Sequence, residues 1–273
     1  MSGVAKALQV ARSNLHRRPS LRDWSPNNSA DELLLARIRA VASERGSYGY
    51  RRVTALLKRE LSAEGKPAAN HKKVYRLMRA HQLLLQRHTG KPTRTHDGKI
   101  VTLKSDLRWC SDSFEIRCWS GERVHVAFSL DCCDREVISY VAQAEYLTGS
   151  NIRDLIAQTV EKRFAPRPYR VPHPVEWLSD NGPIYTAYET REFGRSVGLF
   201  VCTTPAYSPQ SNGMAEAFIK SFKRDYVYLN RLETAESVLK QLAEWFEDYN
   251  ERAPHRALRM RSPREFRRAN STC

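Results

Sequence analysis

The chain has 273 residues and a formal net charge of +15, from 45 Lys and Arg against 30 Asp and Glu. Residues 1–100 hold 21 basic and 7 acidic side chains (+14), residues 101–255 hold 18 and 22 (−4), and residues 256–273 hold 6 and 1 (+5). Clustered Lys and Arg gain free energy by releasing counterions from phosphates, so the two ends predict a polyanionic partner. A basic surface that only aids solubility is the alternative at this point.

The composition excludes chain-wide disorder and a membrane protein. Hydrophobic residues at 41% and aromatic residues at 10% are enough for a packed core. No apolar run approaches the roughly 18 residues of a membrane span, and residues 1–21 lack the apolar stretch of a signal peptide, so we expect a soluble, cytoplasmic chain. The six cysteines include no C-x-x-C pair, which predicts reduced thiols and no zinc site.

The first 30 residues are interpreted as a partial helix-turn-helix and a linker. Residues 4–18 suit two short helices around a tight turn, and the second helix would expose Arg12, Arg17 and Arg18. An amphipathic surface helix fits the same pattern. Residues 19–30, with Pro26 and three polar residues after it, have the composition of a linker.

Residues 31–86 are predicted to form a small all-helical DNA-binding domain. Helices are expected over 31–45, over 50–61 and from about residue 70, each with apolar residues at helical spacing on one face. The outer faces of the last two helices carry basic residues that we expect to contact DNA: Arg51, Arg52, Lys72, Lys73, Arg76 and Arg79. A basic last helix is typical of such domains, although a solvated basic face remains the alternative. Residues 87–105 have the composition of a connector.

From residue 101 the pattern changes to strands followed by helices. Residues 109–118, 124–130 and 136–142 alternate between apolar and polar and are joined by short turns, which predicts an antiparallel meander. A helix (151–164), a strand (175–179), a helix (188–197), a strand (200–202) and two helices (213–230 and 235–250) are predicted next. This order predicts an α/β domain over residues 106–252, with a mixed five-stranded sheet flanked by helices, and a basic tail over 253–273.

Three carboxylates stand where oxygen ligands would be useful. Asp112 interrupts an apolar strand face, which is costly unless the carboxylate is paired or binds a cation. Asp180 ends a strand and Glu216 lies in the first turn of a helix, although a D-N-G turn and a helix dipole would also explain them. Together they supply three hard oxygen donors for Mg²⁺, and two such ions about 4 Å apart can promote phosphoryl displacement.

The segments around these carboxylates resemble a known family. The motifs, in order, are Y-G-Y-R-R (48–52), R-W-C-S-D (108–112), L-D-C-C-D-R (130–135), W-L-S-D-N-G-P (177–183), T-P-A-Y-S-P-Q-S-N-G-M-A-E (204–216) and S-P-R-E-F (262–266). The set resembles the OrfB-type bacterial insertion-sequence transposases of the DDE, retroviral-integrase-like superfamily. The resemblance implies a ribonuclease H-like fold in which Asp112, Asp180 and Glu216 are the catalytic residues and bind two Mg²⁺ ions, or Mn²⁺ as a substitute.

The resemblance also implies a reaction and its partners. Water would attack a phosphodiester at the end of the element, and the freed 3′-hydroxyl would then attack another phosphodiester. Neither step needs an ATP-binding loop, and the sequence has no Gly-x-x-x-x-Gly-Lys motif. The expected partners are double-stranded DNA of the terminal repeats and of the target, further copies of the chain on DNA, and an upstream-frame protein or fusion. The expected place is the bacterial cytoplasm, at the nucleoid.

Further DNA contacts are expected near Glu216. Lys220 and Lys223 follow it at i+4 and i+7 on the same helical face, where they would meet DNA phosphates unless this face is merely solvated. Gln210 is a candidate contact near the cleaved bond, as the resemblance suggests, and Tyr207 lies in the same loop. The basic tail is expected to add contacts to the DNA backbone.

Two other functions fit parts of the sequence. A DNA-binding regulator or domesticated module with an inactive core would explain the +14 of residues 1–100, although the intact carboxylates argue against it. A ribonuclease that acts on RNA–DNA hybrids would share the fold, although the basic N-terminal helices disfavour it.

Overall fold

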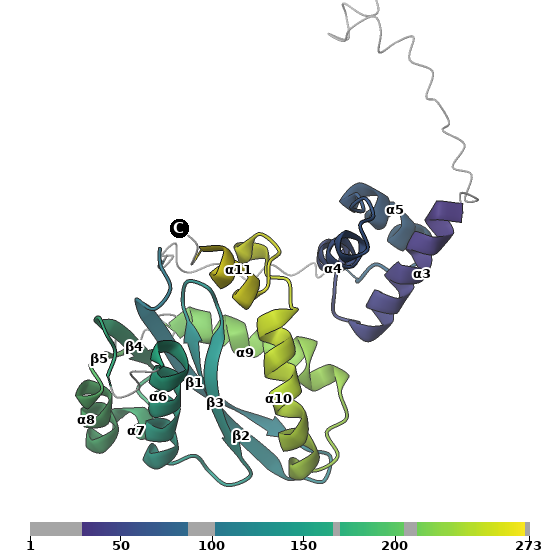
Figure 1. Cartoon of the computed structure of the whole chain (residues 1–273). Helices are drawn as coiled ribbons and strands as arrows, with labels where there is room; N and C mark the ends of the chain where they lie inside the picture. The colour runs from purple at the N-terminus through teal and green to yellow at the C-terminus, as the bar shows by residue number, and fades with distance from the viewer. Residues whose placement is uncertain (1–28, 87–101, 166–169, 205–211, 271–273) are drawn as a thin grey trace, which may run out of the picture.

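The computed structural model describes residues 29–86, 102–165, 170–204 and 212–270. Its first part is a small helical domain, and its second part is a sheet with helices on both faces (Figure 1). The predicted partial helix-turn-helix lies outside the described residues, as does most of the connector. None of the described helices is long and apolar enough to cross a membrane.

The helical domain consists of α3 (Ser29–Glu44), α4 (Tyr50–Ala63) and α5 (His71–Ala80). Their apolar faces meet in one cluster, in which Ile38, Val53 and Val74 are fully buried. α5 begins at Asn70, whose side chain accepts a 2.8 Å hydrogen bond from the backbone N–H of Lys72 and so satisfies one of the free amides of the first turn. The three-helix prediction is confirmed, with bounds that differ by one or two residues.

The sheet contains β1 (Arg108–Arg117), β2 (Arg123–Asp131), β3 (Val137–Gln143), β4 (Val175–Ser179) and β5 (Leu199–Thr203), in the order β3-β2-β1-β4-β5. The first three strands pair antiparallel as the predicted meander. β4 pairs parallel with β1, and β5 pairs parallel with β4. The prediction of a mixed five-stranded sheet is therefore confirmed.

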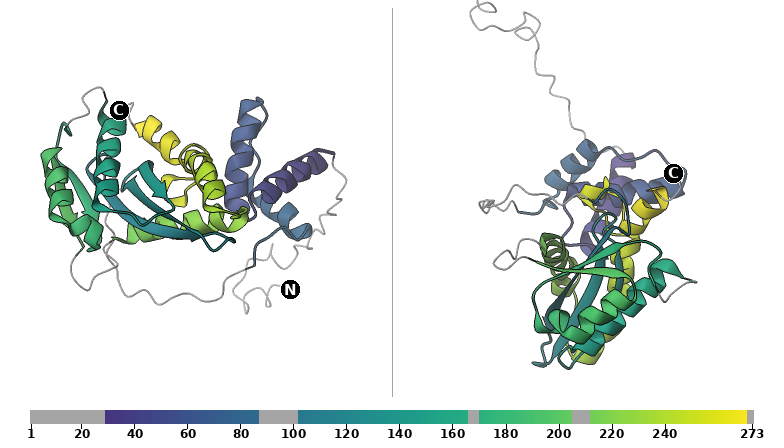
Figure 2. Two further views of the ribbon diagram at one scale, coloured as in Figure 1. Left: turned by 90° about the horizontal axis from the view of Figure 1, so that it is seen from below. Right: turned by 90° about the vertical axis from the view of Figure 1, so that its left-hand side faces the viewer.

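Helices cover both faces of the sheet (Figures 1 and 2). α6 (Gly149–Phe164), α7 (Pro183–Thr186) and α8 (Tyr188–Ser196) share one apolar cluster with the sheet, and α9 (Gly213–Asp225) and α10 (Ala235–Glu251) share another. The alternation of β1 divides its side chains between the two clusters: Cys110 and Phe114 join α9 and α10, whereas Trp109 joins α6. Asp112 belongs by this alternation to the α9 face.

The C-terminal segment is folded rather than extended. After η2 (Val227–Leu229) and α10, the chain forms η3 (Arg256–Leu258) and α11 (Pro263–Asn270), where a basic tail was expected. Ser262 and Glu265 form a reciprocal cap, since each backbone N–H donates to the other's side chain, at 2.8 and 3.3 Å. The helix predicted over 213–230 is also shorter, because α9 ends at Asp225 and η2 follows it.

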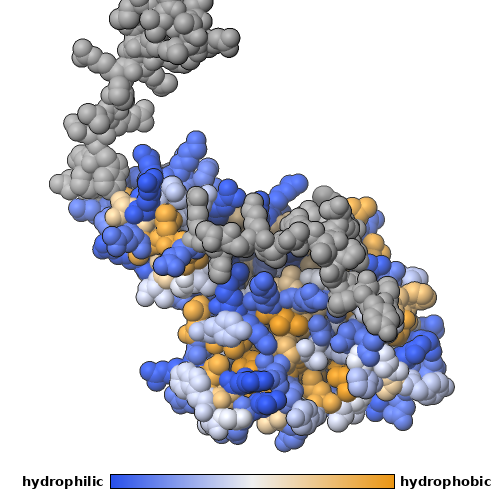
Figure 3. All heavy atoms as spheres, turned by 180° about the vertical axis from the view of Figure 1, so that it is seen from behind, coloured by the Kyte–Doolittle hydropathy of each residue, from blue (hydrophilic) through white to orange (hydrophobic). Residues whose placement is uncertain are grey.

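The surface mixes polar and apolar residues. On the face seen from behind, hydrophobic patches lie among hydrophilic side chains in both parts of the molecule (Figure 3).

Among the described cysteines, Cys110, Cys118 and Cys132 are buried, and Cys133 and Cys202 are partly buried. All five are free thiols, as predicted.

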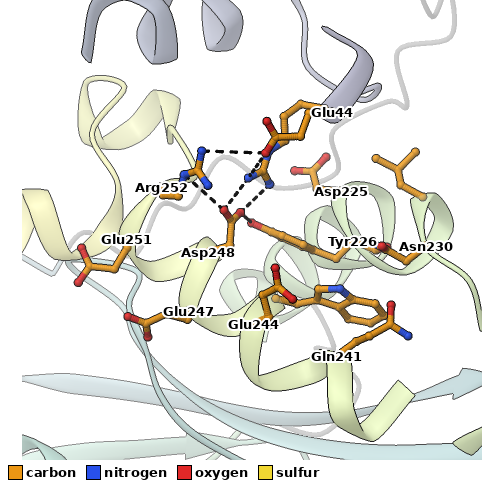
Figure 4. A pocket seen from close by; sticks show the side chains of 13 residues that line it. Glu44, Asp225, Tyr226, Asn230, Gln241, Glu244, Glu247, Asp248, Glu251 and Arg252 are labelled. Carbon is orange, nitrogen blue, oxygen red and sulfur yellow. Dashed lines mark hydrogen bonds and ion pairs between the residues drawn. The ribbon is translucent and has the colours of Figure 1, made fainter. Parts of the chain in front are cut away.

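Two carboxylates, the buried Asp225 and the partly buried Asp248, join the helical domain to α9 and α10. Asp225 accepts hydrogen bonds from Ser47 at 2.6 Å and from Arg52 at 2.7 Å, and its side chain is only 4% exposed. Asp248 binds both terminal nitrogens of Arg45 at 2.6 Å. Figure 4 shows Asp248 at the centre of this junction, with the Tyr226 hydroxyl 2.7 Å away and Arg252 on its other side.

Replacement of Asp225 with Ala should therefore destabilise the whole chain. The change leaves the Arg52 guanidinium partly buried without its carboxylate, and we expect the free energy of unfolding to fall by about 3 kcal/mol. Chemical denaturation of the full chain would measure it. Glu236→Ala is the matched control, because Glu236 and its partner Lys240 are both exposed and no measurable change is expected. Equal stability of the Asp225 variant and the parent would contradict the prediction.

Candidate active site

Asp112 and Asp180 are neighbours because of the pairing of β1 with β4. The two strands run parallel, with Trp109 opposite Trp177 and Cys110 opposite Leu178. Two residues further along this register, Asp112 lies opposite Asp180, the first residue after β4 ends. Adjacent strands are about 4.8 Å apart, so the register brings the two carboxylates close together.

Glu216 is brought to the same place by the start of α9. Asn212, the residue before this helix, is 4% exposed and donates from Nδ2 to the backbone carbonyl of Ser111 at 3.1 Å. Ala215 and Phe218 bury the inner face of the helix in the core. Glu216 lies one helical turn after Asn212 and is exposed. The bond from Asn212 to Ser111 therefore fixes the turn of α9 that carries Glu216 next to Asp112 on β1.

The carboxylates interact through their charges but do not converge on one point. One oxygen of Asp112 accepts a 2.7 Å hydrogen bond from the backbone N–H of Ser113, and one oxygen of Asp180 accepts a 3.0 Å bond from that of Gly182. Within the described ranges, no group of three or more His, Cys, Asp and Glu side chains is placed to hold a metal ion. Coordination of one ion by all three carboxylates would therefore require their side chains to turn.

The electrostatics of Asp112 favour a cation nearby. The pKa of Asp112 is raised to about 6, chiefly by burial and also by the negative charges of Asp180 and Glu216, against the lowering effect of the Ser113 hydrogen bond. Asp112 has no Lys or Arg partner among the residues that the structure describes. Three carboxylates are an all-oxygen donor set of the kind that Mg²⁺ prefers, and a divalent ion would offset their mutual repulsion. The residues present therefore fit a hard divalent cation.

Three residues that support the site were not predicted from the sequence. Ser111 donates from its hydroxyl to the Tyr185 hydroxyl at 3.1 Å, and burial raises the pKa of Tyr185, so it stays protonated. Asn212 holds the start of α9 through its bond to the Ser111 carbonyl. Asn181 donates to the backbone carbonyl of Thr204 at 3.0 Å and ties the turn after β4 to the end of β5. The N-G pairs at 181–182 and 212–213 were the available signal, but they indicate turns rather than partners.

The basic residues predicted near Glu216 have two different environments. Lys220 is exposed on α9. Lys223 is half-buried, with its ammonium 5.5 Å from the centre of the Phe114 ring, and burial lowers its pKa. Tyr207 and Gln210 lie outside the described residues.

The basic residues predicted to contact DNA in the helical domain also differ in their surroundings. Arg51, Lys72, Arg76 and Arg79 are exposed, and Lys72 and Arg76 help to line a groove of about 760 Å³ on α5. Lys73 forms an ion pair with Asp31.

Arg52, which was predicted to contact DNA, binds a carboxylate within the protein. Its guanidinium binds Asp225 and lies 3.5 Å from the centre of the Tyr48 ring, so the side chain joins the two parts of the chain instead. A sequence pattern cannot show this, because the carboxylate partner is 173 residues away. Arg12, Arg17 and Arg18 lie outside the described residues.

Comparisons with known proteins agree with this arrangement. A family model described as an HTH-like domain matches residues 29–91, and two described as an integrase core domain match residues 103–209 and 201–263. The chain is similar to the transposase InsD for insertion element IS2A/D/F/H/I/K of Escherichia coli, at 44% identity over 98% of this chain and 91% of the relative. InsD for insertion element IS2-9 of Escherichia coli strain K12 is also 44% identical, over 98% of this chain and 89% of the relative.

The fold has a counterpart among solved structures. A chain of the simian T-cell lymphotropic virus intasome, solved in complex with the PP2A regulatory subunit B56 gamma, is similar at a TM-score of 0.50 and 15% identity, over 85% of this chain and 74% of that chain. This likeness concerns the fold alone, and it agrees with the predicted ribonuclease H-like sheet. With the two integrase core matches and 44% identity over almost its whole length, the chain belongs to the DDE-type transposases of insertion elements.

Proposed function

We propose that this transposase cuts and joins DNA at the ends of an insertion element with Asp112, Asp180 and Glu216 as its catalytic, metal-binding carboxylates. The observation that carries the proposal is the parallel register of β1 and β4, which sets Asp112 beside Asp180. The hydrogen bond from Asn212 to Ser111 supports it, because it fixes the helix that carries Glu216 next to the same pair. Neither feature can be read from the motif spacing alone.

Two Mg²⁺ ions, or Mn²⁺ in their place, are the proposed cofactors. Bound at the three carboxylates, they would supply charge to activate the attacking oxygen and to stabilise the leaving oxygen of an in-line displacement. The chain's own task is to present ionised carboxylates in a fixed arrangement. Because the pKa of Asp112 is about 6, this group is mostly ionised at neutral pH and becomes protonated in mild acid.

The proposed DNA contacts within the described residues are basic residues whose side chains are exposed. Lys220 lies one turn beyond Glu216 on the same helix, where its ammonium would meet a phosphate of the strand in the site. Arg51, Lys72, Arg76 and Arg79 expose their charges on the helical domain and would bind the terminal repeat. Tyr207, Gln210, Arg12, Arg17 and Arg18 remain candidate contacts outside the described residues. Target DNA, further copies of the chain and an upstream-frame protein remain proposed partners.

The carboxylates can be tested by isosteric changes. Asp180→Asn and Glu216→Gln keep the size of each side chain and remove its charge, and the carboxamide oxygen introduced by Asp180→Asn would still accept the hydrogen bond from Gly182. Cleavage and joining of terminal-repeat DNA should each fall by roughly 10²- to 10³-fold or more, as when one preorganised electrostatic group is lost. A strand-transfer assay with Mg²⁺ would measure both steps.

DNA binding serves as the internal control for that assay. Binding by the Asp180 and Glu216 variants should remain near the parent's level, because neither residue is proposed to hold DNA. Asp154→Asn is a matched variant, since Asp154 is exposed on α6 across the sheet from α9, and it should retain activity. Joining at the parent's level by either carboxylate variant would refute the assignment.

The raised pKa of Asp112 predicts how the stability of the folded chain depends on pH. The pKa of Asp112 is higher in the folded chain than the ordinary value near 4, so the folded state binds the extra proton between about pH 4 and 6. Asp112 should therefore make the parent less stable as pH rises through this window, and Asp112→Asn should lose less stability than the parent, because only the other buried acids still titrate. Above pH 6 the variant should be the more stable by on the order of 1 kcal/mol, a figure reduced for the partial exposure of Asp112.

Melting curves at pH 5 and pH 8, without divalent ions, would measure this difference. Added Mg²⁺ should raise the melting temperature of the parent at pH 8, much less at pH 5, and hardly at all in the variant, because protons and metal compete for the same carboxylate. An equal effect of Mg²⁺ on parent and variant would contradict the metal assignment of Asp112.

Asn212 should act as a positioning residue for Glu216. Asn212→Ala removes the 3.1 Å hydrogen bond to the Ser111 carbonyl and frees the first turn of α9. We expect joining to fall by roughly 10- to 100-fold, the usual range for residues that orient metal ligands, and the Mg²⁺ concentration for half-maximal rate to rise. Titration of Mg²⁺ in the strand-transfer assay measures both. An unchanged Mg²⁺ requirement would show that the start of α9 is held by other contacts.

A further inference from the structure

A second basic surface lies away from the carboxylates, where α4 meets the C-terminal segment. A groove of about 740 Å³ opens between them, and α11 lies beside the helical domain there (Figure 1). Five of its lining residues are basic and one is acidic: Arg51, Lys58, Arg59, Arg259, Arg261 and Glu265. Glu265 is already engaged, since it binds Arg59 at 2.5 Å. We call this surface the α4 groove.

Five arginines of the C-terminal segment separate into two groups. Arg264, Arg267 and Arg268 form ion pairs with Glu136, Glu247 and Glu251, and so hold α11 against the core. Arg259 and Arg261 are exposed, and no carboxylate pairs with them in the part of the chain that the structure describes. Lys58 on α4 is likewise exposed and unpaired among the described residues. Lys58, Arg259 and Arg261 all line the α4 groove.

Arg59 holds the two walls of the groove together. It donates to the backbone carbonyls of Arg252 at 2.7 Å and Met260 at 3.1 Å, besides its ion pair with Glu265. Its guanidinium is thereby used within the protein, and it spans from α4 to three points of the C-terminal segment. Arg59 therefore ties α4 to the C-terminal segment across the groove.

The turn that carries Arg259 and Arg261 is strained. Arg259 and Met260 have φ angles of 56° and 65°, a left-handed conformation that is unfavourable for a residue other than glycine. Hydrogen bonds between His255 and the turn hold it closed, at 3.0 Å to Arg261 and 2.8 Å from Met260. A strained backbone persists only where the surrounding contacts fix it, and here it places two arginines on the wall of the groove.

We propose that the α4 groove binds the phosphate backbone of duplex DNA, through Lys58, Arg259 and Arg261, as a site separate from the carboxylates. Unpaired cations on a fixed surface gain free energy by displacing counterions from phosphates, which every DNA sequence presents alike. The contact is therefore independent of DNA sequence. It rests on the proposed function only in that the ligand is DNA.

The test is the salt dependence of DNA binding by the full chain. The triple variant Lys58→Gln, Arg259→Gln, Arg261→Gln should lower the slope of log K against log salt concentration by about 2 to 3, at about 0.9 for each phosphate that the variant no longer neutralises. The change should be equal for a terminal-repeat duplex and an unrelated duplex of the same length, because phosphates carry no sequence. Fluorescence anisotropy in EDTA measures it without metal, so a failure of the carboxylate assignment would leave this result unaffected.

A control with the same loss of charge separates direct binding from net charge. Arg195→Gln, Arg231→Gln, Lys240→Gln removes three exposed cations from α8, from the loop before α10 and from the first part of α10. Its slope should stay within about 0.5 of the parent's. If both triple variants change the slope by the same amount, or if neither does, the groove does not hold DNA and an acidic protein becomes the better occupant. The single variant Lys58→Glu, at an exposed position, gives the same comparison should the triple variant fold poorly.

Discussion

The parallel pairing of β1 with β4 is the constraint on which the candidate active site depends. It fixes Asp112 against Asp180 along the strand direction, and a shift of one residue would turn Asp112 to the opposite face of the sheet. Ser111 secures this register from two directions, because Asn212 binds its carbonyl at the start of α9 and Tyr185 of α7 binds its hydroxyl. The position of Glu216 follows from the same residue. One backbone register therefore places all three carboxylates.

Two buried acids elsewhere in the molecule, Asp225 and Glu136, differ from Asp112 in the direction of their pKa shift. Burial acts to raise the pKa of Asp225 and Glu136, but hydrogen bonds and charges from arginine more than offset it and hold each pKa below its ordinary value. Arg163, with a side chain only 1% exposed, is shared between Asp134 and Glu136. Asp112 has no such partner among the described residues, and its pKa is raised instead. Asp131 and Asp134 also keep pKa values above their ordinary range although Arg163 lies beside them, so an arginine partner lowers the pKa of some buried acids of this fold and not of others.

Local sequence patterns predicted the helices and strands of this fold, but they could not predict contacts between residues that are far apart in the sequence. The alternation in β1 to β3 and the apolar spacing of α9 and α10 predicted their types and most bounds to within two residues, because burial of one face dictates the pattern. The cap formed by Ser262 and Glu265 is a local signal too, and it would have predicted α11. The role of Arg52 could not be predicted, since an arginine that binds DNA and one that binds Asp225 look alike in sequence. Nor could the motifs show that Asn212 reaches Ser111.

The helical domain and the active site share α9 as a common support. Asn212 fixes the first turn of this helix to β1, and Asp225 at its last turn is held by Ser47 and Arg52 of the helical domain. Glu216 and Asp225 are nine residues apart, roughly 13 Å along a rigid helix. Rotation of the helical domain would have to break the ion pairs at Asp225 and Asp248 or draw Phe218 and Phe222 out of the core, and either change costs several kcal/mol. The position of the helical domain relative to Glu216 is therefore fixed by the same helix that carries Glu216.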